Sequence, residues 1–129
     1  MLIPIDTGMA PSGSPVNGTV RAGNMVFMAQ VPRDPQTGEM VLGDMRVQAR
    51  QVLSNFKRCI EAAGGSLKDI ALITAYLIDG SDVSAMNEVY AQVMDQPYPC
   101  RATVVVKDLL YPGVRVEMIA WAVLGETGS

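Results

Sequence analysis

The stretch "DMRVQARQVLSNFKRCIEAAGGSLKDIALITAYLID", Asp44–Asp79, decides the fold because its hydrophobic period changes partway along. Its first part repeats apolar residues at the 3.6-residue spacing of an amphipathic helix. Asp44 is a good N-cap for this helix, and Gly64 with Gly65 is a stop signal. The second part is rich in strand-forming residues and predicts a strand over Ile70–Ile78. The apolar positions that define the helix are Ala49, Val52, Leu53, Phe56, Cys59, Ile60 and Ala63.

Further elements are predicted on both sides of this unit. The segment "GTVRAGNMVFMAQVP" predicts two strands joined by a turn at residues 22–24. A second helix, capped by Ser81 or Asp82, ends before the prolines of "DQPYP", which prevent its continuation. Two more strands are predicted, at Arg101–Lys107 and at Val114–Leu124.

The predicted order is therefore β-β-α-β-α-β-β within a single domain that spans residues 1–129. Such an order predicts an α+β fold, in which one mixed sheet carries both helices on one face. Residues 1–14 are rich in Gly, Pro and Ser and are expected to be irregular, although "MLIPI" could add a short edge strand. Residues 125–129, "GETGS", are expected to form a frayed tail.

Composition limits the class of protein. No apolar run reaches the roughly 18 residues of a membrane span, and the N-terminal residues break too early with proline and glycine for a secretory signal. A cytoplasmic protein without membrane contact is therefore the default expectation. The formal net charge is −3 and the basic residues form no stripe, which argues against nucleic acid as a partner. Because only 18% of residues are charged, part of the surface is expected to be buried in a homo-oligomer.

The chain contains no histidine. This excludes the Ser-His and Cys-His nucleophile pairs and every zinc site that needs a histidine ligand. Its two cysteines, Cys59 and Cys100, are too few for a disulfide framework or for a zinc site made of cysteines alone. No metal site is therefore predicted. Any chemistry must come from Arg, Asp, Glu, backbone groups, water or the substrate.

An arginine stands near the start of the apolar strand in "YPCRATVVV", Tyr98–Val106. A guanidinium is a planar fork that matches a carboxylate in a bidentate manner. Either Arg101 meets an anionic ligand there, or it has a structural role: it reaches solvent, pairs with a neighbouring Asp or Glu, or caps a helix terminus. We expect the all-apolar face of this strand to pack against the helices and the arginine to face away from them. Alternation along the strand assigns Ala102, Val104 and Val106 to the apolar face, and Arg101, Thr103, Val105 and Lys107 to the other.

Three further side chains are candidates for a site. Glu117 is the only acid inside a predicted strand, so it either acts as an acid or base or forms a cross-strand ion pair. Asn87, in the middle of the second helix, either orients a small ligand or is solvated. Cys100 precedes Arg101, whose charge can lower the pKa of a thiol; without a histidine base, an inert thiol is the alternative.

Taken together, the order of elements and four stretches resemble the RidA/YjgF family of reactive-intermediate deaminases, formerly called L-PSP endoribonucleases. The resemblance implies a bacillus-type chorismate-mutase-like fold. It also implies a homotrimer whose sheets form a central barrel, with clefts between neighbouring subunits. The stretches are "GNMVFMAQVPRDPQTGE", "QARQVLSNFKRCIEAAGGSLKDI", "MNEVY" and "YPCRATVVV" with "VRVEMIAWAV".

The same resemblance implies hydrolysis of 2-imino or 2-enamino acids to 2-keto acids and ammonia, without a cofactor. Arg101 matches the family arginine that holds the substrate carboxylate, and backbone donors near Arg101 and Ala102 would help to place substrate and water. Asn87 matches a family residue of the cleft. An imine is already electrophilic, so orientation and modest activation of water are sufficient, which agrees with the lack of histidine.

The sequence departs from the family pattern at several cleft positions. Val16 stands where the "GPYSQ"-like motif has an aromatic residue, and Met28 and Ala29 replace the first two residues of "SGQ". In the common ending "EIEAIA", Glu117 matches the first glutamate, and Ile119 stands at the second, to which the resemblance attributes the activation of water. The chain is therefore either a deaminase that uses Glu117 or accepts a bulkier apolar substrate, or a non-catalytic or regulatory member that binds a small carboxylate metabolite.

Overall fold

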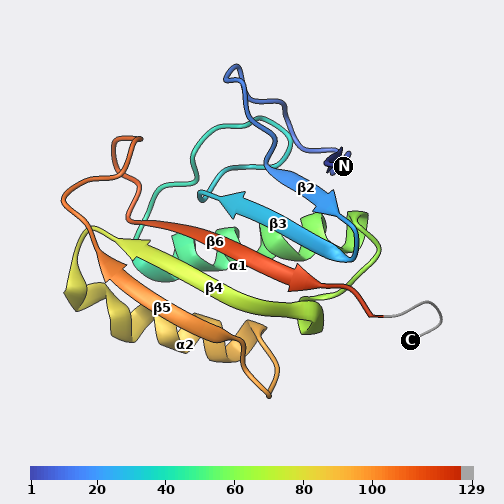
Figure 1. The fold of residues 1–129 in the computed structure, drawn as a ribbon. Coiled ribbons are helices and arrows are strands. Elements are labelled where there is room, and N and C mark those ends of the chain that lie inside the picture. Colours follow the sequence, from blue (N-terminus) through green and yellow to red (C-terminus); the bar gives the residue numbers. More distant parts are fainter. Residues whose placement is uncertain (126–129) are drawn as a thin grey trace.

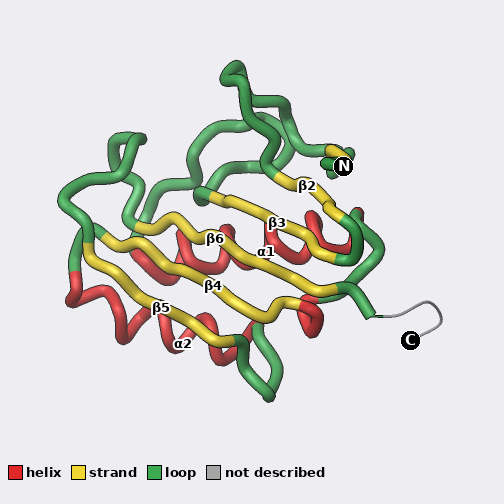
Figure 2. Tube along the Cα trace, viewed as in Figure 1, coloured by secondary structure: helices red, strands yellow, loops and turns green. Residues whose placement is uncertain are grey.

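The structure is a computed structural model that describes residues 1–125. One six-stranded sheet has the order β1-β2-β3-β6-β4-β5, and the two helices lie behind it in Figures 1 and 2. Only β4 and β5 are parallel neighbours, so the sheet is mixed, as predicted. The elements are β1 (Ile3–Pro4), β2 (Thr19–Ala22), β3 (Met25–Gln30), α1 (Met45–Ala62), β4 (Ile70–Leu77), α2 (Val83–Val93), β5 (Cys100–Val105) and β6 (Val116–Val123), with 3-10 turns at Leu67–Asp69 and Gly80–Asp82.

The predicted order of elements is confirmed, with one addition at the N-terminus. The two-residue strand β1 pairs antiparallel with β2, which is the short edge strand that "MLIPI" allowed. The remaining residues up to Ser14 form no regular element, as expected. Beyond Gly125, the predicted C-terminal tail lies outside the described residues.

Helix α1 forms where the sequence predicted it because both of its ends carry the expected signals. The Asp44 side chain accepts a hydrogen bond from the Val47 amide at 3.0 Å, which satisfies a free donor of the first turn. After Ala63, Gly64 has φ +95, a conformation that favours glycine and ends the helix. All seven apolar positions named for this helix are buried: Ala49, Val52, Leu53, Phe56, Cys59, Ile60 and Ala63.

The core lies between the sheet and the helices, and β4 and β6 are its central strands. Along β6 alternate residues point to opposite sides of the sheet, as predicted. One set, Val116, Met118, Ala120 and Ala122, is completely buried against the helices. Helix α1 packs over β3 and β6, and α2 packs beside α1.

The prediction for the faces of β5 was wrong. Arg101 pairs in register with Ile73, which is fully buried in the core. Because paired residues of neighbouring strands point to the same side, Arg101 lies on the helix-covered side of the sheet, not away from it. The apolar residues Ala102 and Val104 point to the other side. β5 is an edge strand with exposed residues on both sides, so its hydrophobic alternation does not mark the core.

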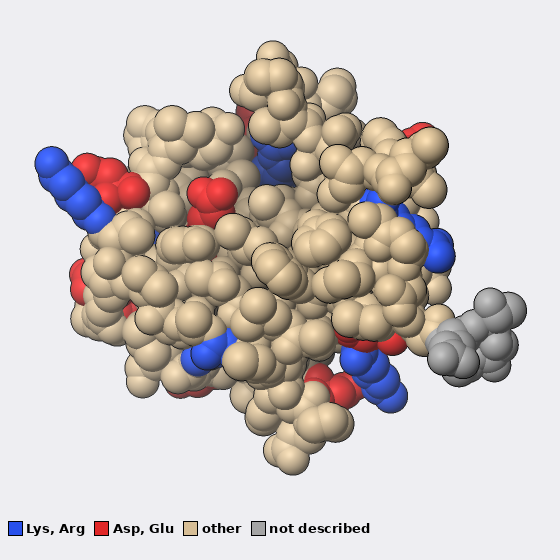
Figure 3. Space-filling view, in the orientation of Figure 1, with Lys and Arg blue, Asp and Glu red and all other residues tan. Residues whose placement is uncertain are grey.

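The side of the sheet opposite the helices has no other element covering its strands in Figures 1 and 2. Most atoms over these strands belong to uncharged residues in Figure 3. Among the described residues, neither helix has the length and apolar character needed to cross a bilayer. We call this side the open face; by strand register its residues include Phe27, Ala29, Thr74, Tyr76, Ala102, Val104, Glu117, Ile119 and Trp121.

Candidate functional site

Arg101 is held in place by two side chains of α2. Its Nη2 atom donates a hydrogen bond to Asn87 Oδ1 at 2.6 Å. The guanidinium carbon lies 4.6 Å from the centre of the Tyr90 ring, a cation–π geometry. Asn87 and Tyr90 are three residues apart and therefore share one face of the helix. The structure thus brings together Arg101 and Asn87, two of the predicted site residues.

Arg101 does not form the ion pair with a neighbouring Asp or Glu that was the alternative to ligand binding. Within residues 1–125, no carboxylate lies at ion-pairing distance from its guanidinium. Its partner Asn87 is neutral, and one hydrogen bond leaves other N–H donors of the fork unused. A partly exposed guanidinium that is oriented but not neutralised can bind an anion in a bidentate manner.

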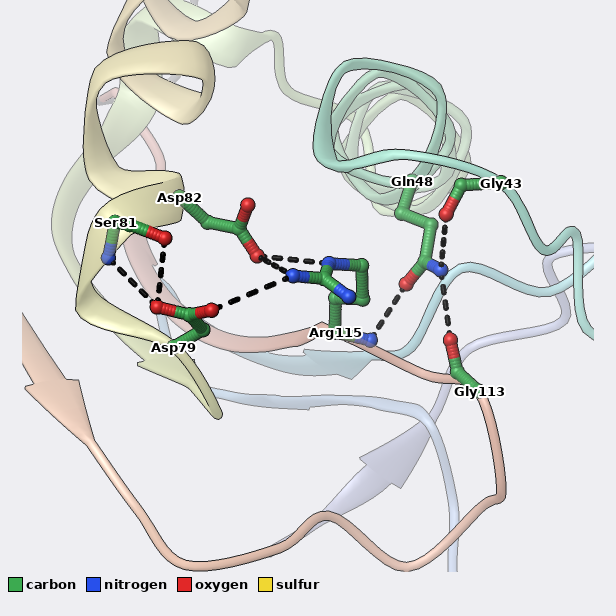
Figure 4. Close-up of polar contacts among 7 residues, drawn as sticks. All are labelled: Gly43, Gln48, Asp79, Ser81, Asp82, Gly113 and Arg115. Atoms are coloured by element: carbon green, nitrogen blue, oxygen red, sulfur yellow. Dashed lines mark hydrogen bonds and ion pairs between the residues drawn. The ribbon is translucent and has the colours of Figure 1, made fainter.

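Arg115 shows what a structural arginine looks like in this protein (Figure 4). Its guanidinium binds Asp82 through Nη2 at 2.7 Å and through Nε at 2.8 Å, and Asp79 lies 3.8 Å away. The Asp79 carboxylate also accepts bonds from Ser81, which hold its pKa below the ordinary value, so it remains ionised beside the arginine. These contacts join the start of β6 to the start of α2.

The buried Gln48 side chain completes this connection (Figure 4). Its Oε1 accepts a hydrogen bond from the Arg115 amide at 2.7 Å. Its Nε2 donates to the carbonyls of Gly43 and Gly113, at 3.1 and 2.9 Å. Gln48 therefore fixes the segment that enters β6, two residues before Glu117.

A partly open cleft of about 580 Å³ lies beside the start of β6 and the end of β3, and it contains Glu117. Figure 3 shows a hollow in the upper part of the open face. The cleft walls come from the segment before β2, the end of β3 and the loop before β6, and they include apolar residues such as Leu110 and Tyr111. A cleft of this size lies within the range of small-molecule sites.

Glu117 is half-buried in this cleft and makes no hydrogen bond or ion pair to any residue that the structure describes. Burial raises its pKa above the ordinary value, because removing water disfavours the charged carboxylate. The predicted cross-strand ion pair is therefore not formed. A carboxyl group with a raised pKa, in a cleft and without a partner, is suited to acid–base chemistry.

The other predicted site residues divide into two groups. Val16 and Ala29 line the cleft together with Glu117. Met28 does not, because strand alternation places it in the core, where only 2% of it is exposed. Ile119 lies on the open face, two residues from Glu117 along β6, and is not among the residues that line the cleft of this chain.

Arg101 and the cleft cannot meet around one small molecule within a single chain. Glu117 pairs with Tyr76 of β4, which pairs with Val104 of β5, so two strand spacings of about 5 Å each separate β6 from β5. Arg101 and Glu117 also lie on opposite sides of the sheet. A site that uses both residues therefore needs two copies of the chain.

Several cleft residues were not predicted from the sequence. Arg33 follows β3, and the loop residues Leu110 and Tyr111 precede β6, where no periodicity indicates the direction of a side chain. Thr19 and Gln30 are buried and each carries a side-chain oxygen that lacks a hydrogen-bond partner among the described residues. The sequence feature that could have indicated these two residues is their position as polar residues at the ends of predicted strands. Within residues 1–125, no three Cys, Asp or Glu side chains gather in a way that could hold a metal ion.

Comparison with known proteins identifies the family. The family model for endoribonuclease L-PSP matches residues 7–124. A RutC family protein of Pyrococcus horikoshii is 46% identical over 83% of this chain and 86% of its own length. A 2-iminobutanoate/2-iminopropanoate deaminase of Dermatophagoides farinae is 33% identical over 81% of this chain and 84% of its own. The crystal structure of E. coli TdcF with bound serine superposes with a TM-score of 0.85 at 35% identity, covering 95% of this chain and 99% of that one. The chain therefore belongs to the endoribonuclease L-PSP family, the RidA/YjgF family that its sequence resembles.

Proposed function

We propose that this protein hydrolyses 2-imino or 2-enamino acids to 2-keto acids and ammonia. The observation that carries the proposal is the state of Arg101, which is oriented by Asn87 and Tyr90 but has no carboxylate partner among the described residues. The charge that is missing from the protein is the one that every substrate of this class supplies. Arg101 would hold the substrate carboxylate, and the Ala102 backbone beside it would help to place the ligand.

Glu117 would act on water in this scheme. Its raised pKa makes it a stronger base than an ordinary glutamate once it is ionised, and the cleft leaves it free to reach a ligand. Water adds to the carbon of the C=N bond and passes a proton to Glu117. Glu117 passes that proton to the nitrogen, which gives a carbinolamine. It then takes the proton of the new hydroxyl group and passes it to the amino nitrogen, so that the C–N bond breaks, ammonia leaves and the C=O bond of the 2-keto acid forms. No cofactor is needed, because the imine carbon is already electrophilic.

The separation of Arg101 and Glu117 supports a site shared between two copies of the chain. One copy would supply Arg101 and Asn87, and its neighbour would supply the cleft with Val16, Ala29 and Glu117. Exposed apolar residues on the open face, such as Trp121 at 43% and Val104 at 41%, favour burial against another subunit. We propose the homotrimer with a central barrel, in which every subunit contributes to two such sites.

The relatives agree with this proposal. The mite protein is named for deamination of 2-imino acids, and the E. coli protein was crystallised with serine, a ligand that carries a carboxylate. The second candidate function is a non-catalytic or regulatory member that binds a small carboxylate metabolite. Two departures from the family pattern favour it: Val16 stands in place of an aromatic residue, and Ile119 stands in place of a glutamate.

The test is hydrolysis of 2-iminobutanoate, generated in situ by an amino acid oxidase and followed by its disappearance. Arg101→Met should lower kcat/KM at least about 100-fold, because two charge-assisted hydrogen bonds to the carboxylate are lost. Arg50→Gln is the matched control, since Arg50 is exposed on α1 and binds Gln92 of α2.

Three outcomes separate the alternatives. Wild-type turnover that is lost in Arg101→Met and kept in Arg50→Gln supports the deaminase. Saturable binding of 2-oxobutanoate that depends on Arg101, without turnover of any imine, supports the binding protein instead. Ile119→Glu adds a carboxylate where the family pattern has one; an unchanged rate would show that the acid missing there does not limit this protein.

A further inference from the structure

A second arginine, Arg33, lies in the same cleft as Glu117. It is three residues beyond the end of β3 and was not among the site residues predicted from the sequence. Its Nε atom is buried, and among residues 1–125 it has neither a hydrogen-bond partner for this atom nor an ion pair for its guanidinium. Basic atoms are visible inside the hollow of the open face in Figure 3.

The backbone of Arg33 is held by hydrogen bonds, and this fixes the position from which its side chain starts. Its carbonyl accepts a hydrogen bond at 2.9 Å from Asn55 Nδ2, a side chain of α1 that is only 1% exposed. Arg33 also forms an isolated β-bridge with Met40. This anchoring holds the residue at the wall of the cleft.

Neither the acid next to Arg33 in sequence nor the acid in its cleft forms an ion pair with it. The neighbouring Asp34 accepts hydrogen bonds from the amides of Gln36 and Thr37, at 2.8 and 3.0 Å. These bonds lower the Asp34 pKa and direct its carboxylate back onto its own turn. Glu117 lines the same cleft but lies beyond ion-pairing distance from Arg33. A partly buried guanidinium without a counter-charge is costly unless an anion joins it.

We propose that Arg33 binds a second carboxylate of the ligand, so that the preferred substrates are 2-imino acids with an acidic side chain. The inference rests on the proposed function, in which Arg101 of a neighbouring subunit holds the first carboxylate. The two arginines would then bind the two carboxylates of the ligand. Glu117 would face the imine carbon, which lies next to the carboxylate held by Arg101. The cleft of about 580 Å³ has room for this longer ligand, and Leu110 and Val16 offer apolar contact to its methylene groups.

The test compares binding of two stable keto acids by calorimetry, 2-oxoglutarate with two carboxylates and 2-oxobutanoate with one. The wild type should bind 2-oxoglutarate about 10- to 100-fold more tightly, which is the contribution of one charge-assisted pair. Arg33→Gln should abolish this preference and leave binding of 2-oxobutanoate unchanged. Arg33→Lys should keep part of it, because a lysine retains the charge without the planar fork. Arg50→Gln is the control, and thermal unfolding confirms that each variant is folded.

The outcomes distinguish the two proposals. Equal affinity of the wild type for both keto acids, or a preference for 2-oxoglutarate that persists in Arg33→Gln, overturns the role of Arg33. If Arg101→Met still lowers the affinity for 2-oxobutanoate in that case, the proposed function stands without a role for Arg33. Failure of the wild type to bind either keto acid overturns the role of Arg33, and imine turnover in the wild type and in Arg101→Met then decides the proposed function separately. A preference lost in Arg33→Gln and partly kept in Arg33→Lys supports the second carboxylate site.

Discussion

Asn87→Asp is a sharp test of the free charge on Arg101. Asn87 Oδ1 lies 2.6 Å from Nη2 of the arginine, so the substitution replaces a neutral acceptor by a carboxylate of nearly the same shape. An oriented but unpaired guanidinium would become half of an ion pair. The change affects no core side chain, because Asn87 is exposed on α2.

The size of the effect follows from the distances in this site. A ligand carboxylate on the outer side of the guanidinium would lie about 5 Å from the new Asp carboxylate. Two like charges at this distance repel by about 1 kcal/mol in water and about 3 kcal/mol at the effective dielectric constant of a protein surface. The affinity for a small keto acid should therefore fall about 5- to 150-fold. Asn87→Ala, which loses only one hydrogen bond, should cost about 2- to 10-fold.

The assay is calorimetric titration with 2-oxobutanoate at pH 7 for the wild type, Asn87→Ala and Asn87→Asp. Added salt should reduce the difference between the two variants, since salt screens exposed charges. Thermal unfolding should show that Asn87→Asp is at least as stable as the wild type, because a new ion pair forms. Equal affinity of Asn87→Asp and Asn87→Ala would refute the role of Arg101 as the carboxylate anchor.

Three other predictions concern the cleft, the core and the assembly. If Glu117 is the base, kcat/KM for an imino acid should rise with pH to a midpoint above the 4.5 of an ordinary glutamate, since burial raises its pKa and only the ionised form accepts a proton. Glu117→Gln should remove this rise and lower kcat at least about 100-fold; an unchanged pH profile would exclude the role. Gln48→Leu removes three hydrogen bonds at a fully buried position and should cost about 3 kcal/mol of unfolding free energy in urea, where a loss below about 1 kcal/mol would contradict the network. Trp121→Lys should dissociate the trimer in sedimentation velocity, and a trimer that persists would show that the open face is not its interface.

The sequence predicted best the elements whose two faces meet different environments. In β6, alternation separated the buried residues from Glu117, Ile119 and Trp121 on the open face. In α1, the cap at Asp44 and the apolar stripe agreed, so both ends of the helix were correctly placed. When one face of an element is buried and the other is exposed, apolar residues are selected on the buried face only, because the hydrophobic effect stabilises them there. The sequence then shows a periodic pattern of apolar residues.

The same reasoning failed where this contrast is absent. β5 has exposed residues on both sides, so its valines gave no indication of which side faces the helices, and Arg101 was assigned to the wrong one. Arg33, Leu110 and Tyr111 lie in segments without periodicity, where long-range packing decides which residues approach Glu117. Met28 was assigned to the cleft because it stands in a family motif. Its side chain instead points into the core, because residues alternate between the two sides of strand β3.

The position of Arg101 and Glu117 on opposite sides of one sheet has a genetic consequence. In the proposed ring, each site takes its arginine from one chain and its glutamate from the next, so two different defects can compensate for each other. Arg101→Met and Glu117→Gln would each inactivate a pure trimer, yet a trimer assembled from both would contain one intact site. Random co-assembly in equal amounts would then restore about a quarter of wild-type activity. Intragenic complementation of two dead alleles would thus arise from the geometry of a single sheet.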